Sequence, residues 1–185
     1  MANLLTIANI LTIIRLLLVP FFAVSAVYND LQTALLIFII AAITDTLDGL
    51  AARYFRQSTT LGRILDPMAD KLLIVTAFVI LTLPGRGFEP IPFWLTAIVI
   101  SRDIFIVLGA LAIHITTGFR GFRPSVPGKV STSVQLVTLA AVLAANVWGG
   151  FGEYLRGLYY ITFAVTLFSG IHYIFHVAKL VESDG

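Results

Sequence analysis

Six long apolar runs constrain the fold of this chain more than any other feature of its sequence. Each run approaches the roughly 20 residues that an α-helix needs to cross a lipid bilayer. Only 12% of the residues are charged, where about a quarter is usual in a soluble domain. The runs cover about residues 4–27, 33–52, 68–84, 91–113, 130–148 and 157–178. The sequence therefore predicts one all-α integral membrane domain over residues 1–185, with six transmembrane helices.

Composition excludes several classes of function. The chain has no cysteine, which rules out disulfides, thiolate metal sites and a cysteine nucleophile. The net charge of +2 and the lack of a basic tail argue against a nucleic-acid partner. The N-terminal MANLLTIANI lacks the basic start and the small-residue cleavage site of a signal peptide, so we expect the first run to be retained.

Basic residues in the loops predict the orientation in the membrane. Six spans would place eight of them on one side, namely Arg53, Arg56, Arg63, Lys71, Arg120, Arg123, Lys129 and Lys179, and only Arg86 and Arg156 on the other. Loops rich in Lys and Arg stay on the cytoplasmic side. We therefore expect a multi-pass protein of a bacterial cell membrane, with cytoplasmic termini and cytoplasmic loops after the second and fourth runs.

Four aspartates gather between the second and third runs, in the stretch DTLDGLAARYFRQSTTLGRILDPMAD. Asp45 and Asp48 share one helix face because they are three residues apart, and Asp66 and Asp70 do so at a spacing of four. Asp66 followed by Pro67 is typical of a helix N-cap and first turn. Two adjacent helix ends would aim four carboxylates at one small volume.

Such a cluster needs protons or cations, because neighbouring carboxylates resist being ionised together. Oxygen ligands without His or Cys favour Mg²⁺ or Mn²⁺, and two such ions bridged by carboxylates can clamp an in-line displacement at phosphorus. Arg53 adds a forked cation suited to phosphate oxygens. Gly49 and Gly62 leave space for a ligand to approach the backbone.

The same stretch carries a family pattern, D-x2-D-G-x2-A-R-x8-G-x3-D-x3-D. It is met in full by Asp45, Asp48, Gly49, Ala52, Arg53, Gly62, Asp66 and Asp70. The chain resembles the CDP-alcohol phosphatidyltransferases, membrane enzymes that move a phosphatidyl group from a CDP-lipid to an alcohol and release CMP. The opening ANILTIIRLLLVP is similar to the family's PN-x-LT-x2-R-x4-P, with Ala8 in place of proline and with Asn9, Thr12 and Arg15 retained.

The resemblance implies a six-helix fold, often homodimeric, whose site lies in a polar cavity open to the cytoplasm. It implies that Asp45, Asp48, Asp66 and Asp70 hold two Mg²⁺ or Mn²⁺ ions and that Asp70 is also the general base for the acceptor hydroxyl. The CDP-diacylglycerol donor would be bound by Asp48, Gly49, Ala52, Arg53 and Gly62. Asn9, Thr12 and Arg15 are further candidates for the site, although Arg15 could instead extend to the membrane interface.

Two downstream segments, ISRDIFIVLG and RPSVPGKVSTSVQL, resemble the branches of the family that make glycerophospholipids. On this resemblance we place Arg102, Arg123 and Lys129 around an acceptor phosphate. Thr132 and Gln135 either contact the acceptor or form hydrogen bonds between helices.

The acceptor stays open between two alcohols. Phosphatidylglycerophosphate synthases commonly carry a second arginine about two turns after the first, and here that stretch reads IVLGALAI. The spacing R-P-S-x3-K-V-x-T-x-V-Q-L looks closest to cardiolipin synthases, whose acceptor phosphatidylglycerol is a monoanion that needs fewer cations. Glycerol 3-phosphate is the commoner acceptor for chains of this length, so we place it narrowly ahead of phosphatidylglycerol.

An ion or proton transporter is the rival interpretation, because carboxylates within a membrane also serve ion pathways. Transporters favour dispersed acidic residues, interrupted helices and inverted repeats. The sequence shows none of these patterns, and transport does not explain Arg53 beside the two glycines.

Overall fold

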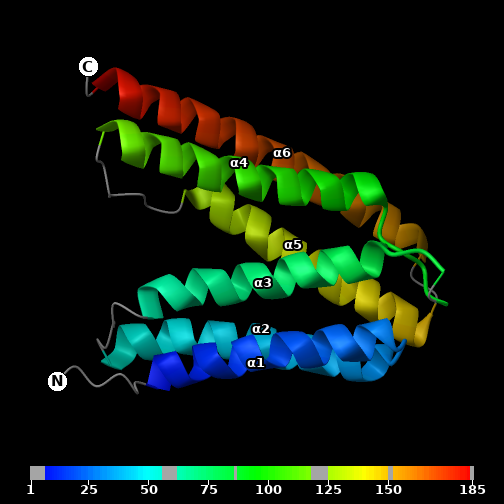
Figure 1. Ribbon diagram of the computed structural model, residues 1–185. Coiled ribbons are helices and arrows are strands. Elements are labelled where there is room, and N and C mark those ends of the chain that lie inside the picture. The colour runs from blue at the N-terminus through cyan, green and yellow to red at the C-terminus, as the bar shows by residue number, and fades with distance from the viewer. Residues whose placement is uncertain (1–6, 56–61, 86, 118–124, 150–151, 184–185) are drawn as a thin grey trace. The chain divides into compact units, whose positions relative to one another are not determined.

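The computed structural model describes residues 7–55, 62–85, 87–117, 125–149 and 152–183, and side chains for most of them. These residues form six α-helices joined by turns and loops (Figure 1). The helices are α1 (Ile7–Val27), α2 (Leu31–Phe55), α3 (Gly62–Thr82), α4 (Phe93–Thr117), α5 (Val126–Trp148) and α6 (Gly152–Ser183). Each predicted apolar run overlaps one helix, so the all-α prediction is confirmed for the described part of the chain.

The start of α3 differs from the prediction. The helix begins at Gly62, four residues before Asp66, so Asp66 is not the N-cap and Pro67 lies beyond the first turn. The predicted boundary followed the point where hydropathy rises. Helical backbone continues through the polar stretch before that point, because a helix end is set by backbone geometry rather than by hydropathy.

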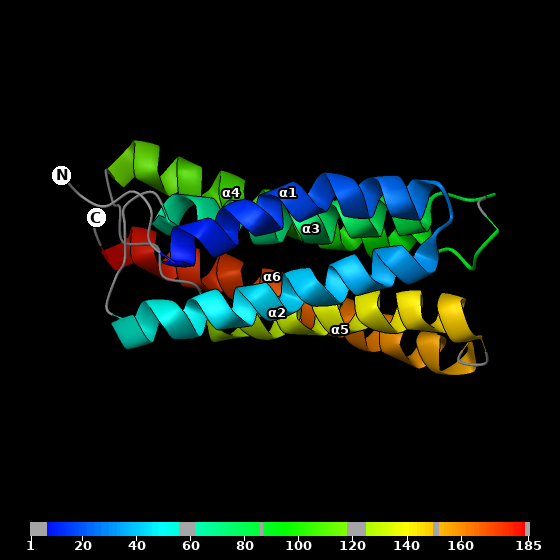
Figure 2. The same ribbon diagram turned by 90° about the horizontal axis from the view of Figure 1, so that it is seen from below.

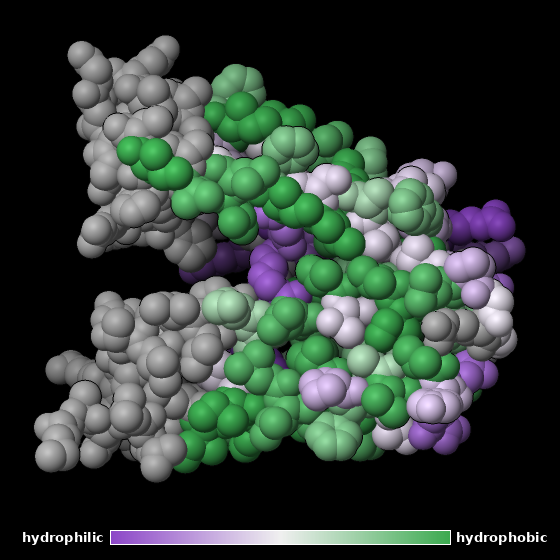
Figure 3. Space-filling view, in the orientation of Figure 1, coloured by the Kyte–Doolittle hydropathy of each residue, from purple (hydrophilic) through white to green (hydrophobic). Residues whose placement is uncertain are grey.

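Three helices in the described part are long and apolar enough to cross a membrane. Their windows are Ile10–Val27, Val126–Trp148 and Gly152–Phe175. Many large apolar side chains on them are exposed, including Leu17, Phe21 and Phe168, and apolar residues cover much of the visible surface (Figure 3). Water disfavours so large an apolar surface, and lipid does not, so these helices are those of a membrane protein.

The chain divides into two compact units. Unit 1 contains residues 1–91 and 139–150, and in it α1 packs against both α2 and α3 (Figures 1 and 2). Phe22 of α1 contacts Phe38 of α2 in the core of unit 1, with ring centroids 6.0 Å apart.

The turn between α1 and α2 is tight. Asn29 adopts a φ of 62°, and Asp30 caps α2 because its Oδ1 accepts a hydrogen bond from the Thr33 N–H at 3.2 Å.

Unit 2 contains residues 92–138 and 151–185, and here α4 packs against α6 (Figure 1). Trp94 stacks on Tyr160 and forms a T-shaped pair with Phe163, with ring centroids 5.8 and 5.6 Å apart, respectively. The α5 helix begins at a cap in which the Ser125 Oγ accepts a hydrogen bond from the Gly128 N–H at 3.2 Å. Because the chain divides into two units, a single functional domain over residues 1–185 stays a prediction.

Candidate active site

A buried arginine joins three helices in unit 1. Arg15 of α1 is 0% exposed, and its Nη1 lies 2.8 Å from the Oδ1 of Asp45 on α2. The same Nη1 donates a hydrogen bond to the Oδ1 of Asp70 on α3. Two predicted site residues, distant in sequence, therefore converge on one nitrogen atom.

The position of Arg15 follows from the pattern of α1. Thr12, Arg15, Phe22 and Ala26 are fully buried, and their spacing places them on one helix face. Arg15 therefore points into unit 1, and the alternative in which it extends to the membrane interface is wrong. A buried guanidinium is costly unless carboxylates compensate it, and Asp45 and Asp70 do so.

The two carboxylates differ from Arg15 in being partly open. The side chains of Asp45 and Asp70 are 38% and 33% exposed. They can therefore be reached by a ligand from outside while Arg15 contacts them from within. Their Oδ1 atoms converge on a cationic nitrogen, and carboxylate oxygens are donors of the kind that a hard divalent cation prefers.

The remaining predicted metal and donor residues belong to the same two helices. Asp48, Gly49, Ala52 and Arg53 lie on α2, and Gly62 and Asp66 lie on α3. Their side chains, and that of Asn9 on α1, lie outside the described part of the structure. Among the side chains that are described, no group of three or more His, Cys, Asp or Glu residues could hold a metal. The structure thus brings together one aspartate from each predicted pair.

A second buried arginine lies in unit 2. Arg102 of α4 is 7% exposed. Its Nη1 donates to the Asp103 Oδ1 at 2.8 Å, and its Nη2 donates to the Ser169 Oγ of α6 at 2.6 Å. A Cβ atom added at Gly128 of α5 would lie 3.3 Å from Nη2. Arg102 is therefore enclosed by three helices and compensated by its neighbour.

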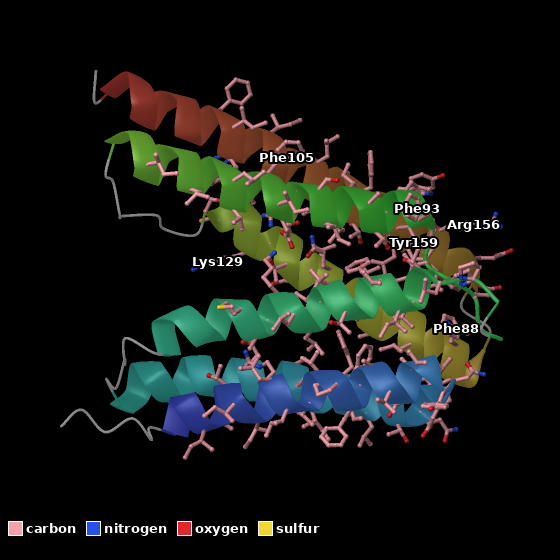
Figure 4. All side chains as sticks on the ribbon, viewed as in Figure 1. Phe88, Phe93, Phe105, Lys129, Arg156 and Tyr159 are labelled. Atoms are coloured by element: carbon pink, nitrogen blue, oxygen red, sulfur yellow. The ribbon has the colours of Figure 1, made fainter. Side chains whose placement is uncertain are left out.

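The other four predicted acceptor residues lie in four different situations. Lys129 is exposed on the first turn of α5 (Figure 4), and Arg123 lies outside the described residues. The Thr132 hydroxyl donates to the Gly128 carbonyl of its own helix at 3.2 Å. The buried Gln135 amide donates to the Thr166 Oγ1 of α6 at 3.4 Å, which is the interhelical hydrogen bond that the sequence left as an alternative.

Apart from Gln135, sequence reasoning missed a row of buried polar side chains between α5 and α6, which we call the hydroxyl seam. It consists of Ser131, Gln135 and Thr138 on α5 and Thr162, Thr166 and Ser169 on α6. The Thr138 and Thr162 Oγ1 atoms are 2.6 Å apart, and those of Ser131 and Thr166 are 3.3 Å apart. The recurrence of these residues at intervals of three and four could have revealed the seam.

Comparison with known proteins decides the family. The family model described as CDP-alcohol phosphatidyltransferase matches residues 5–172. The chain belongs to the CDP-alcohol phosphatidyltransferase family. The match covers Arg15, Asp45, Asp70 and the hydroxyl seam, so each of these features lies within the family domain.

Relatives within the CDP-alcohol phosphatidyltransferase family carry two names. The chain is 36% identical to the CDP-diacylglycerol–glycerol-3-phosphate 3-phosphatidyltransferase of Shigella flexneri serotype 5b, over 91% of this chain and 92% of that one. It is 33% identical to human cardiolipin synthase (CMP-forming), over 96% of this chain and 63% of that one. The probable cardiolipin synthase of Drosophila melanogaster is 32% identical, over 93% of this chain and 58% of that one. The chain thus spans about three fifths of the length of these two cardiolipin synthases.

Proposed function

We propose that this protein transfers a phosphatidyl group from CDP-diacylglycerol to sn-glycerol 3-phosphate, forming phosphatidylglycerophosphate and CMP. The observation that carries the proposal is the convergence of Asp45 and Asp70 on one cationic position, within a chain of this family. The near-complete mutual coverage with the glycerol-3-phosphate 3-phosphatidyltransferase of Shigella flexneri supports the choice of acceptor.

The proposed site contains Asp45, Asp48, Asp66 and Asp70 as ligands of two Mg²⁺ or Mn²⁺ ions. When bound, these ions supply charge neutralisation on the diphosphate and on the departing CMP. Arg53 holds the diphosphate of the donor through its forked guanidinium. Gly49, Ala52 and Gly62 leave room for the cytidine part.

Asp70 takes the proton in the proposed reaction. The acceptor hydroxyl oxygen forms a bond to the lipid-side phosphorus, and the bond from that phosphorus to the CMP oxygen breaks. The hydroxyl proton passes to Asp70. Since Arg15 engages the Asp70 Oδ1, we assign the proton to the other carboxylate oxygen, Oδ2.

The proposed setting is a cell membrane that the six helices cross, with both termini and the site cavity facing the cytoplasm. The three described apolar windows and the unequal distribution of Lys and Arg support this topology. The protein would meet its donor in the lipid layer and act as a homodimer, as the resemblance implies.

Phosphatidylglycerol is the second candidate acceptor, which would make the product cardiolipin. The pairing of Arg102 with Asp103 favours it, because a compensated guanidinium attracts a phosphate dianion less strongly than a free one. The missing second arginine in IVLGALAI points the same way. A monoanionic diester would need only the remaining cations, Arg123 and Lys129.

One assay tests both candidates. Purified protein is given CDP-diacylglycerol and Mg²⁺ or Mn²⁺, with glycerol 3-phosphate, phosphatidylglycerol or inositol phosphate in parallel, and released CMP is measured. We expect CMP release that depends on glycerol 3-phosphate. Release with phosphatidylglycerol alone would select the second candidate. Absence of release with all three, together with ion flux in proteoliposomes, would support a transporter instead.

A further inference from the structure

The Arg15 guanidinium stands where two carboxylates would bind a metal. Its Nη1 lies 2.8 Å from the Asp45 Oδ1 and also contacts the Asp70 Oδ1. Arg15 reaches these atoms from the interior of unit 1, where it is 0% exposed, while both aspartates are about one third exposed. One cation from within the protein therefore occupies the oxygens that a cation from outside would need.

We propose that Arg15 is an internal counter-cation that competes with a divalent ion for the Oδ1 atoms of Asp45 and Asp70. Binding of the ion then requires Arg15 to give up at least one of these contacts. The inference rests on the proposed metal site, but it concerns the ion-free protein and the cost of loading it. Arg15 is a positioning residue in this scheme, because it touches carboxylates and not the reacting atoms.

Charge explains why competition is expected. Without an ion, Asp45 and Asp70 would repel each other, and Arg15 relieves that repulsion by contacting both. A divalent ion binds carboxylate oxygen at about 2.0–2.1 Å for Mg²⁺. A guanidinium nitrogen held at hydrogen-bond distance from the same oxygen would then face a dication at close range, and the two cations repel strongly in a partly buried site.

The scheme has two consequences for loading. Arg15 keeps the two carboxylates directed at one point before the ion arrives, which preserves the geometry of the site. It also weakens ion binding, because its contacts must be broken or lengthened first. Removal of Arg15 should therefore tighten ion binding and should make the ion-free protein less stable.

The test compares ion binding in four proteins. Free Mn²⁺ is titrated by its electron paramagnetic resonance signal with wild type, Arg15→Met, Arg15→Lys and the matched control Arg156→Met, which alters an exposed arginine of α6 (Figure 4). We expect Arg15→Met to bind Mn²⁺ at least about tenfold more tightly than wild type, Arg15→Lys to lie between them, and Arg156→Met to match wild type. The thermal shift caused by Mg²⁺, relative to chelator, should be larger in Arg15→Met.

Unchanged or weaker Mn²⁺ binding by folded Arg15→Met would overturn the inference. If wild type binds no Mn²⁺, or if Asp45→Asn binds it equally well, the proposed metal site itself fails, which is a different result. Should Arg15→Met not fold, wild type with ¹⁵N-labelled arginine guanidinium groups is titrated with Mg²⁺, and Arg15→Lys assigns the signal. We expect the Arg15 signal to shift until the site is saturated, and an unmoved signal at saturation would refute the competition.

Discussion

Two buried arginines are held in opposite ways. Arg15 contacts two carboxylates that are each partly open, whereas Arg102 contacts the buried Asp103 and the Ser169 hydroxyl. A ligand can therefore reach the carboxylates that contact Arg15 without entering the interior. To reach the groups that contact Arg102, it would have to break the packing of α4 against α6.

The role of Asp70 can be tested by Asp70→Asn. We expect acceptor-dependent CMP release to fall by at least about 10²-fold to 10⁴-fold, because the amide cannot take the hydroxyl proton. Thermal unfolding should remain cooperative, and some CDP-diacylglycerol binding should remain. Asp30→Asn is the control, since Asn also serves as an N-cap. Near-normal turnover by Asp70→Asn would remove the base from the mechanism.

Ser169→Ala tests the anchoring of Arg102. The substitution leaves the Arg102 Nη2 buried without the hydroxyl that accepts its 2.6 Å hydrogen bond. An unsatisfied buried donor costs about 1–3 kcal/mol, so we expect the free energy of unfolding in detergent to fall by that amount. An unaltered unfolding midpoint would mean that Arg102 finds another acceptor and is not fixed by Ser169.

Arg102 also shows where prediction from sequence reaches its limit. The resemblance of ISRDIFIVLG to the branches of the family that make glycerophospholipids predicted an acceptor-binding cation at this position. Its partner Ser169 is 67 residues away, and such a long-range pair leaves no local pattern. The pairing of Asp45 with Asp70 was accessible, because both belong to one motif at helix spacings. Their common partner Arg15 was predicted for the site without its contacts.

At the scale of the helices, Thr138 and Thr162 of the hydroxyl seam have fewer hydroxyl protons than hydrogen-bonding contacts. Thr138 lies 2.8 Å from the Val134 carbonyl, and Thr162 lies 2.8 Å from the Leu158 carbonyl. The two hydroxyls are also 2.6 Å from each other. Two hydroxyl protons cannot make three hydrogen bonds. One threonine therefore donates to its own helix while the other donates across the seam.

This proton count predicts a small effect of Thr138→Val. The remaining Thr162 hydroxyl can still donate to the Leu158 carbonyl, so no buried donor is left without an acceptor. We expect a loss of about 0.6 kcal/mol in the free energy of unfolding, the average for hydrogen bonds between membrane helices. Chemical unfolding of Thr138→Val and Ser169→Ala, measured side by side, compares the two losses in free energy of unfolding directly. Equal losses from the two substitutions would show that the seam depends on both hydroxyls of the Thr138–Thr162 pair.

Helix positions followed from hydropathy at their apolar ends and not at their polar ends. The predicted first and fifth runs end at the same residues as α1 and α5, Val27 and Trp148. In contrast, α2 continues to Phe55 and α3 begins at Gly62. The aspartate motif is polar, so hydropathy falls there while the backbone remains helical. Hydropathy therefore cannot locate the end of a helix whose last or first turns are polar because they contain the aspartate motif.

The molecule as a whole is well suited to a topology measurement, because it has no cysteine. Single substitutions Ser58→Cys and Glu89→Cys introduce one thiol each, on opposite sides of the predicted membrane. In intact cells, a membrane-impermeant maleimide should label Glu89→Cys and not Ser58→Cys, and inverted vesicles should give the reverse. Labelling of both positions from one side would contradict the six-helix topology.

The burial of Arg15 has a consequence for the synthesis of the protein. The apolar window Ile10–Val27 carries this arginine at its sixth position, and an arginine within a transmembrane helix costs up to about 3 kcal/mol to insert into a bilayer. Asp45 and Asp70 follow it by 30 and 55 residues. A ribosome therefore delivers the cation well before the carboxylates that compensate it. Until α3 has emerged, Arg15 lacks at least one of the two carboxylates that compensate its charge in the folded protein.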